Sequence, residues 1–238
     1  MTMPLAGTDS ALLQWWRPGL WRLRLPQGRM VVASVTDRTA EAEGSWSMAG
    51  CSRGTVTADQ VHGLSLAAVD LAAAPAHPVA GCDALVTQTF GLGLAIRTAD
   101  CLPLFLWDPA QRVVGVAHAG WRGLAGQLPA RLIRFVHQRY HCNPADLWIG
   151  IGPSIRACCY DVEPAFEVGF NPWVQLRDGR RTCDLTACAI SQLLDAGVRA
   201  ERILDSGQCT ACDPDRWFSL RRDGEACGRL VSCITMTP

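Results

Sequence analysis

The sequence contains no lysine, because all 22 of its basic residues are arginine. This absence excludes a Schiff-base lysine and a Walker-type phosphate loop, since both need a primary amine. Acidic and basic residues balance to a formal net charge of +0 over 238 residues. No long-range field therefore concentrates nucleic acid or an anionic membrane around the protein, and we expect neither as a partner.

Long hydrophobic runs are also missing. No apolar run reaches the roughly 18 residues of a membrane-spanning helix, and the start MTMPLAGTDS lacks the basic and apolar regions of a signal peptide. Twelve cysteines would suggest disulfides in a secreted protein, but this start favours a cytoplasmic protein with mostly reduced thiols. We expect a single domain over residues 1–238.

The middle of the chain has the clearest secondary-structure pattern. Short apolar runs separated by turn residues predict a β-meander over residues 84–87, 94–97, 102–107 and 112–118. Helical spacing predicts a helix over residues 122–139, and Asp184 is a good N-cap for another that ends near residue 196. Further strands are expected at residues 30–35, 147–151, 202–205 and 229–234. The pattern predicts an α/β fold with mixed strands.

The expected hairpin of residues 102–118 places a cysteine and a histidine together. If residues 108–111 form the loop, Trp107 pairs with Arg112 and Cys101 lies opposite His118. Opposed residues share a face with Cβ atoms about 5 Å apart, so one metal ion could bind both. A register slip of one residue would separate them. The hairpin therefore predicts a Cys101–His118 metal-binding pair.

An open catalytic zinc site needs a third ligand. His62 is the best candidate on local context, although a histidine followed by glycine is also typical of a turn. His77 lies between prolines in an expected loop, and His137 and His141 fall late in or after the expected helix, on its surface. The sequence therefore favours His62 as the third ligand.

Asp100 is difficult to explain by packing. It stands beside Cys101 between two apolar strands, where an unpaired buried carboxylate is costly. We interpret Asp100 as a proton carrier or as a residue that orients a metal ligand.

The segment after His118 is suited to an anion. It passes through two glycines into the start of the expected helix, where free backbone N–H groups favour negative charge. Arg122 or Arg97 could bind a phosphate in a bidentate manner. The RRDG at residues 221–224 is expected to be an exposed turn, although its two arginines could also hold an anion.

Most of the cysteines are expected to fill the interior. Cys209 and Cys212 have the spacing of a metal knuckle or a redox pair, but no second pair of matching spacing follows. Cys158 and Cys159 are expected in the interior or in a loop.

Several motifs together resemble the bacterial family once described as polyphenol-oxidase laccases and now as purine nucleoside phosphorylases with adenosine deaminase activity. They follow the family order, and TADC and HAGWRG are the most specific. The principal matches are QVHG at 60–63, DALVT at 83–87, TADCLP at 98–103, AHAGWRG at 117–123, IGPSI at 151–155 and FSLRRDG at 218–224.

This resemblance implies a zinc site held by His62, Cys101 and His118, with copper as a substitute. We take these residues and Asp100 as the candidate catalytic groups, and Arg122, Arg97 and Arg38 as the candidate substrate-binding groups. The implied reactions are phosphorolysis of adenosine, inosine and methylthioadenosine, and deamination of adenosine. The implied fold is an α/β/β/α arrangement of mixed sheets, similar to the catalytic domain of cytotoxic necrotizing factors.

Three alternatives remain open from the sequence. Cys101 could be a thiolate nucleophile activated by His118 in a hydrolase of amide bonds such as those of peptidoglycan precursors. A copper-loaded polyphenol oxidase is disfavoured, because multicopper enzymes need many imidazoles and the chain has five histidines. A non-catalytic relative is the third, because residues 35–38 and 45–49 depart from the family motifs. The oligomeric state is not predicted.

Overall fold

The computed structural model describes residues 13–17, 19–23, 31–40, 51–70, 74–75, 77–177 and 179–237. Its centre consists of two six-stranded sheets, each with parallel and antiparallel pairs. Residues 45–49, where the sequence departs from a family motif, lie outside the described residues.

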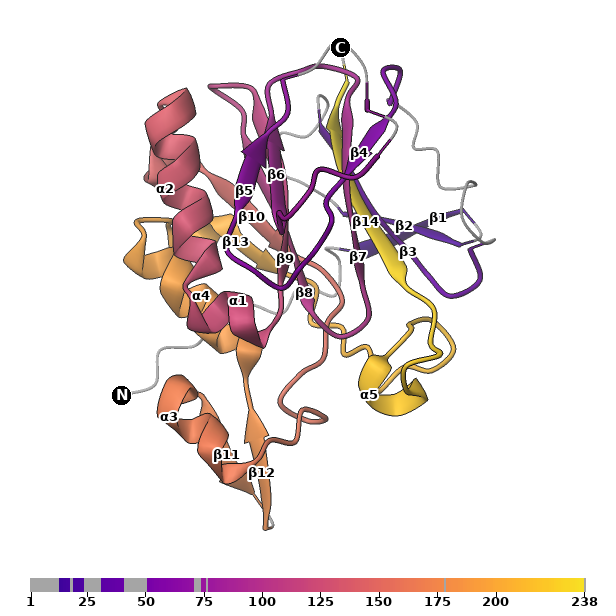
Figure 1. The fold of residues 1–238 in the computed structure, drawn as a ribbon, viewed down its shortest axis with the longest axis vertical. Helices are drawn as coiled ribbons and strands as arrows, with labels where there is room; N and C mark the ends of the chain where they lie inside the picture. Colours follow the sequence, from indigo (N-terminus) through magenta and orange to yellow (C-terminus); the bar gives the residue numbers. More distant parts are fainter. Residues whose placement is uncertain are drawn as a thin grey trace.

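The first sheet has the order β1-β2-β3-β14-β7-β4 (Figure 1). Neighbouring strands in this sheet are antiparallel, except for the parallel pair of β4 and β7. Strand β14 lies between β3 and β7 although it comes last in the chain. The bounds are β1 (Leu13–Arg17), β2 (Leu20–Leu23), β3 (Val31–Thr36), β4 (Thr55–Thr57), β7 (Gly93–Thr98) and β14 (Leu230–Met236).

The second sheet has the order β13-β10-β8-β9-β6-β5, with parallel pairs at both of its edges. Its bounds are β5 (Leu66–Ala68), β6 (Ala84–Thr87), β8 (Leu102–Asp108), β9 (Val113–Ala119), β10 (Trp148–Ile151) and β13 (Ile203–Asp205). A separate hairpin joins β11 (Val174–Arg177) and β12 (Arg180–Cys183).

Helices α1 (Trp121–Ala125), α2 (Leu128–Tyr140) and α4 (Leu185–Asp195) cover the outer face of the second sheet (Figure 1). The short helices α3 (Glu167–Phe170) and α5 (Leu220–Asp223) lie near its lower end. Within the described ranges the layers are therefore helices, second sheet and first sheet, without the second helical layer that the resemblance implies. The similarity to cytotoxic necrotizing factors stays a prediction.

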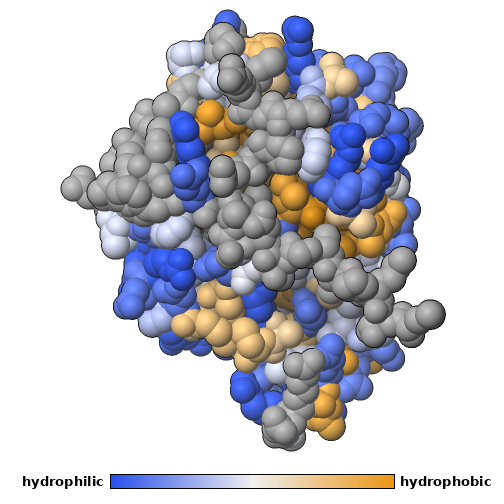
Figure 2. Space-filling view, turned by 180° about the vertical axis from the view of Figure 1, so that it is seen from behind, coloured by the Kyte–Doolittle hydropathy of each residue, from blue (hydrophilic) through white to orange (hydrophobic). Residues whose placement is uncertain are grey.

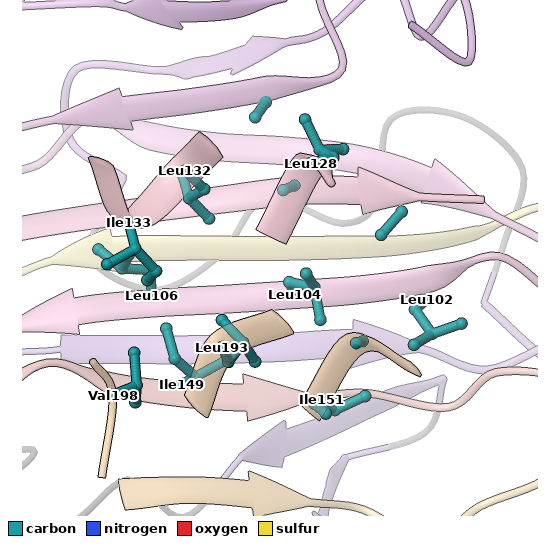
Figure 3. Close-up of a cluster of buried hydrophobic side chains, with 14 of the residues drawn as sticks. Leu102, Leu104, Leu106, Leu128, Leu132, Ile133, Ile149, Ile151, Leu193 and Val198 are labelled. Atoms are coloured by element: carbon teal, nitrogen blue, oxygen red, sulfur yellow. The ribbon is translucent and has the colours of Figure 1, made fainter. Parts of the chain in front are cut away.

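Strands β8 and β9 are buried on both faces, as expected for strands between two layers. Alternate side chains of β8 point to opposite sides, so Leu104 joins the core under the helices while Phe105 joins the core between the sheets. Figure 3 shows the helix-side core, with Leu102, Leu104, Leu106, Ile149 and Ile151 on the strands and Leu128, Leu132, Ile133 and Leu193 on the helices.

Truncating one of these core residues should be costly. Leu106 is 0% exposed, so we expect Leu106→Ala to lower the free energy of unfolding by about 2–5 kcal/mol, through lost burial and a residual cavity. Leu176, which is 67% exposed, provides a matched control whose substitution should change it by at most about 0.5 kcal/mol. Urea denaturation of both variants tests this, and equal effects would contradict the assignment of the core.

The register expected for the β8–β9 hairpin is wrong by two residues. The structure pairs Trp107 with Val114 and Pro103 with His118. The expected loop started one residue too early, because Asp108 still pairs with Val113 while its carboxylate accepts hydrogen bonds from the backbone of the turn at 2.8 and 3.0 Å. A shift of two residues keeps the same face, so Cys101 lies diagonally from His118 instead of opposite.

The predicted β-meander is also wrong, although its strands exist. Strand β7 leaves the second sheet and pairs with β14 and β4 in the first, while β6 pairs with β9. The chain returns through Ala99 and Asp100, and Asp100 adopts a left-handed φ of 87° at this crossover. Short apolar runs do not indicate which of two buried sheets each strand joins.

The expected helix over residues 122–139 is two helices. Helix α1 ends at Ala125 with Gly126 as its C-cap, and Gln127 adopts a left-handed φ of 60° before α2 starts. The prediction for Asp184 is confirmed, because its carboxylate accepts a hydrogen bond from the amide of Ala187 at the start of α4.

The surface carries both hydrophilic and hydrophobic side chains. Figure 2 shows hydrophilic residues with smaller hydrophobic patches between them on the side opposite to the view of Figure 1. Among the described residues, no helix has the length and apolar character needed to cross a bilayer.

Candidate metal centre

The structure brings the three predicted ligands together. One ligand atom each of His62, Cys101 and His118 lies within 4.8 Å of the others. The rings of the two histidines meet edge to face, with centroids 4.7 Å apart. His118 is at the end of β9, Cys101 directly precedes β8, and His62 lies in the loop between β4 and β5.

A buried aspartate holds this loop in place. Asp83, 0% exposed, accepts hydrogen bonds from the amides of His62 and Gly63 at 3.0 and 2.7 Å. His62 itself has a left-handed φ of 58°, which non-glycine residues rarely adopt. Residues held in such conformations cluster at functional sites, because the surrounding contacts must maintain them.

The same carboxylate orients His118. Nδ1 of His118 lies 2.9 Å from Oδ1 of Asp83, and the amide of His118 donates to the backbone carbonyl of Asp83 at 2.8 Å. With Nδ1 engaged in this way, Nε2 is the atom left for a metal or for Cys101. A carboxylate behind a histidine in this geometry is the usual partner of a metal ligand.

Gly120 gives the Cys101 sulfur the space it needs. A Cβ atom at position 120 would lie 3.0 Å from Sγ of Cys101 and 3.3 Å from Cδ2 of His62. Any side chain here would therefore press on two of the three ligands. This requirement explains the first glycine of the HAGWRG motif.

Without a metal, Cys101, His118 and Asp83 influence one another's ionisation. Burial opposes ionisation of Cys101, yet hydrogen bonds with His118 and His62 lower the pKa of its thiol to about 7. Burial also opposes protonation of His118, but Asp83 and Cys101 raise the pKa of its imidazole to about 9. Burial likewise works against the Asp83 carboxylate, whose hydrogen bonds with His118 and Gly63 hold its pKa below the usual value.

The donor set fits a divalent ion. Two imidazoles and a thiolate are ligands of zinc, and three protein ligands are typical of a catalytic site with one open position. Bonds of about 2.0–2.3 Å to one tetrahedral ion separate neighbouring donors by roughly 3.3–3.8 Å, which small side-chain movements would reach from the observed cluster. Copper also binds such a set.

Asp100 uses both carboxylate oxygens for other contacts. Oδ1 accepts from the hydroxyl of Thr210 at 2.6 Å and Oδ2 from the amide of Arg221 at 2.7 Å. Its carbonyl accepts from the amide of Ile155 at 2.9 Å. Asp100 thus connects the segment before Cys101 to three later segments, at Ile155, Thr210 and Arg221.

The three predicted substrate-binding arginines are dispersed. Arg38 donates to the carbonyl of Pro214 and lies over the ring of Phe218. Arg97 is exposed on β7, where its backbone exchanges hydrogen bonds with a glutamine side chain. Arg122 is exposed and stacks on the ring of Trp121 at 4.4 Å.

A cavity of about 710 Å³ lies beside the cluster, within the usual size of a small-molecule site. Trp121 follows Gly120, and the amide of Arg221 binds Asp100, so the cavity and the centre share neighbours. Its lining is mainly aromatic and apolar, with one arginine and two carboxylates: Trp121, Tyr160, Phe166, Arg221, Asp161 and Glu163 are among the residues that form it.

One functional candidate, Asp83, was not predicted from the sequence, and a second, Arg221, was offered only as one of two arginines that could hold an anion. Asp83 stands before an apolar strand, and the reasoning applied to Asp100 would have identified it. Arg221 was expected in an exposed turn, but it lies at the start of α5, lines the cavity and stacks on Tyr160 at 5.0 Å. The position of α5 beside the cavity depends on the tertiary fold, so the sequence pattern alone could not indicate it.

Comparison with known proteins agrees with these motifs. A family model described as "Multi-copper polyphenol oxidoreductase laccase" matches residues 32–237. The chain is 35% identical to "Purine nucleoside phosphorylase YlmD" of Geobacillus stearothermophilus over 75% of this chain and 71% of that protein. It is 34% identical to "Adenosine deaminase RL5" of an unknown prokaryotic organism, over 65% and 62% of the two chains.

Among solved structures, YlmD from Geobacillus stearothermophilus superposes with a TM-score of 0.85 at 28% identity. The match covers 96% of this chain and 100% of the other. Together with the family match over most of the sequence, this similarity means that the chain belongs to the multi-copper polyphenol oxidoreductase laccase family.

Proposed function

We propose that this protein is a zinc-dependent purine nucleoside enzyme that cleaves adenosine, inosine and methylthioadenosine with phosphate and deaminates adenosine. The observation that carries the proposal is the three-ligand cluster beside an aromatic cavity that contains Arg221. The names of the two relatives support the substrate class.

His62, Cys101 and His118 would hold the ion, with Asp83 orienting His118. When bound, the ion supplies Lewis-acid chemistry that polarises an oxygen ligand and lowers the pKa of water. Among the described residues, this is the one candidate cluster that contains histidine, which supports a single ion here over a multicopper arrangement.

The cavity supplies binding and orientation. The rings of Trp121 and Phe166 line the cavity in tilted contact with each other, with centroids 5.6 Å apart, and a ring face directed into the cavity could stack on a purine. Nη1 of Arg221 donates to the carbonyl of Asp161 at 2.8 Å, and the other N–H groups of this guanidinium could donate to phosphate. Phosphorolysis would then join a phosphate oxygen to the ribose anomeric carbon, while the glycosidic bond breaks and the purine leaves with a proton.

A direct assay tests the proposal. The zinc-loaded protein, incubated with adenosine and phosphate, should yield adenine and ribose 1-phosphate, and adenosine alone should yield inosine and ammonia. Inosine with phosphate should release hypoxanthine and ribose 1-phosphate, and methylthioadenosine with phosphate should release adenine and methylthioribose 1-phosphate. If none of these products forms at full zinc loading, the assignment is wrong, and a metal-binding relative without turnover becomes the better reading.

Arg221 should control the use of phosphate. We expect Arg221→Gln to lower kcat/KM for phosphate about 10–100-fold, because a charge-assisted hydrogen bond contributes about 1.5–3 kcal/mol. Steady-state kinetics with phosphate as the varied substrate measures this, and adenosine deamination should change less. Arg122→Gln tests one of the two arginines that the sequence offered for phosphate, and exposed Arg139→Gln is the matched control. Equal kinetics for all three would contradict the role of Arg221.

One observation favours a second candidate function. The pKa of Cys101 near 7 and the protonated His118 behind it form a thiolate–imidazolium pair backed by Asp83. Such a pair is the nucleophile of cysteine hydrolases, which would act on amide bonds. Such a hydrolase would remain active after chelation of the metal and would be blocked by iodoacetamide.

A further inference from the structure

Four cysteines from two distant segments meet outside the candidate metal centre. They are Cys158 and Cys159, which follow β10, and Cys209 and Cys212, which follow β13, and their sulfur atoms all lie within 4.8 Å of one another. Sγ of Cys212 is 3.5 Å from Sγ of Cys158 and 3.3 Å from Sγ of Cys159. Four sulfurs on one tetrahedral zinc ion would lie roughly 3.8 Å apart, so the sulfur cage already has the right size.

The backbone holds the two segments in register. Ser154 and Cys209 form a parallel bridge, in which Ser154 donates to Gln208 at 3.2 Å and accepts from Thr210 at 3.1 Å. Arg156 reinforces the contact, because its guanidinium makes two hydrogen bonds to Asp205 at 2.7 and 2.6 Å. The four thiols are thus brought together by contacts that do not involve the sulfur atoms.

The surroundings also suit thiolates. Backbone N–H groups of Arg156 and Cys212 point at the sulfur of Cys209, an arrangement that stabilises a metal-bound thiolate. Arg180, which is paired with Asp161 at 2.8 Å, also interacts electrostatically with Cys158 and Cys159. Cys158 and Cys212 are exposed, which leaves a path for the ion.

We propose that Cys158, Cys159, Cys209 and Cys212 bind one zinc ion in a closed, structural site that is separate from the His62–Cys101–His118 centre. Four protein ligands leave no open position, which is typical of structural zinc sites. The four thiols lose their protons to solvent when the ion binds. The sequence offered only the Cys209–Cys212 half of this set, because the second pair is adjacent in sequence and lies about fifty residues earlier.

This site would link loops that shape the catalytic region. Thr210, between two of the ligands, donates to Asp100 beside Cys101. Tyr160, directly after Cys159, lines the cavity. A metal at the four-cysteine site would therefore hold both segments together without touching a substrate.

Zinc counting tests the proposal. The protein, purified with a phosphine reductant from zinc-supplemented cells, should contain two zinc ions per chain. Cys212→Ser and His62→Ala should each contain one, and Cys227→Ser, a matched change outside the cluster in the same part of the chain, should contain two. A Cys212→Ser protein with the same zinc content as the unaltered protein would overturn the site.

A second measurement does not depend on the folding of the cysteine variant. In the His62→Ala protein the remaining zinc should show four sulfur neighbours at about 2.3 Å by X-ray absorption, and nitrogen or oxygen neighbours would contradict the proposal. The alternative is a disulfide between the two segments, which peptide mapping after alkylation would detect. Such a disulfide in the reductant-treated protein would also overturn the proposed zinc site. These readouts do not use a substrate, so they are independent of the proposed activity.

Discussion

Replacing Cys101 with alanine should lower the zinc content by one ion per chain and kcat/KM for purine nucleosides by about 10²–10⁴-fold. The magnitude follows from the several kcal/mol that a catalytic metal contributes, at about 1.4 kcal/mol for each factor of ten. Cys101 is the sulfur ligand of the candidate centre, and alanine leaves only His62 and His118. Elemental analysis and initial rates measure the two effects on the same sample.

The comparison protein for this variant is Cys227→Ala, which removes a thiol from outside both cysteine-containing clusters. It should keep full zinc content and activity. Chelation followed by zinc addition should abolish and then restore the activity of the unaltered protein. Activity on amide substrates that survives chelation and is lost to iodoacetamide would instead identify Cys101 as a nucleophile.

Asp83→Asn should weaken zinc binding at the same centre about 10–100-fold, the usual cost of losing a carboxylate behind a metal-binding histidine. Asparagine keeps the size of the side chain, but its amide group cannot accept all three hydrogen bonds that His62, Gly63 and His118 now donate. The left-handed conformation of His62 should lose its support as well. Competition with a chromophoric chelator measures the affinity.

Asp70→Asn is the matched control for this change. Asp70 also accepts several hydrogen bonds, from Gln88 and Tyr140 among others, but it does not contact the candidate ligands. It should leave zinc affinity unchanged even if it lowers stability. Equal zinc affinities for Asp83→Asn and the unaltered protein would show that Asp83 has no part in holding the ion.

The sequence predicted the ligand pair of the hairpin through an incorrect register. Cys101 and His118 still share a face, because side-chain direction repeats every two residues and the error was also two residues. The predicted pair is therefore correct despite this error. An error of one residue would have placed Cys101 and His118 on opposite faces of the sheet. Asp108 caused the error by pairing in the strand while capping the turn with its side chain.

The location of β7 and the role of Asp83 depend on tertiary contacts that local patterns do not contain. The apolar residues of β7 would be buried equally well in either sheet. Its position in the first sheet follows from the left-handed turn at Asp100 and from its pairing with β14. The partners of Asp83 lie about twenty residues before it and thirty-five after it. The four-cysteine cluster is similar, since spacing within one segment cannot identify ligands from another.

The central position of β14 in the first sheet has a consequence for biosynthesis. Residue pairs such as Ser232 with Val35 join segments from opposite ends of the described chain. While the ribosome is still translating, β3 and β7 cannot be bridged, and both present unpaired backbone edges. The inter-sheet core can close only after this strand has emerged, so folding should be slow, largely post-translational and dependent on protection of those edges from aggregation.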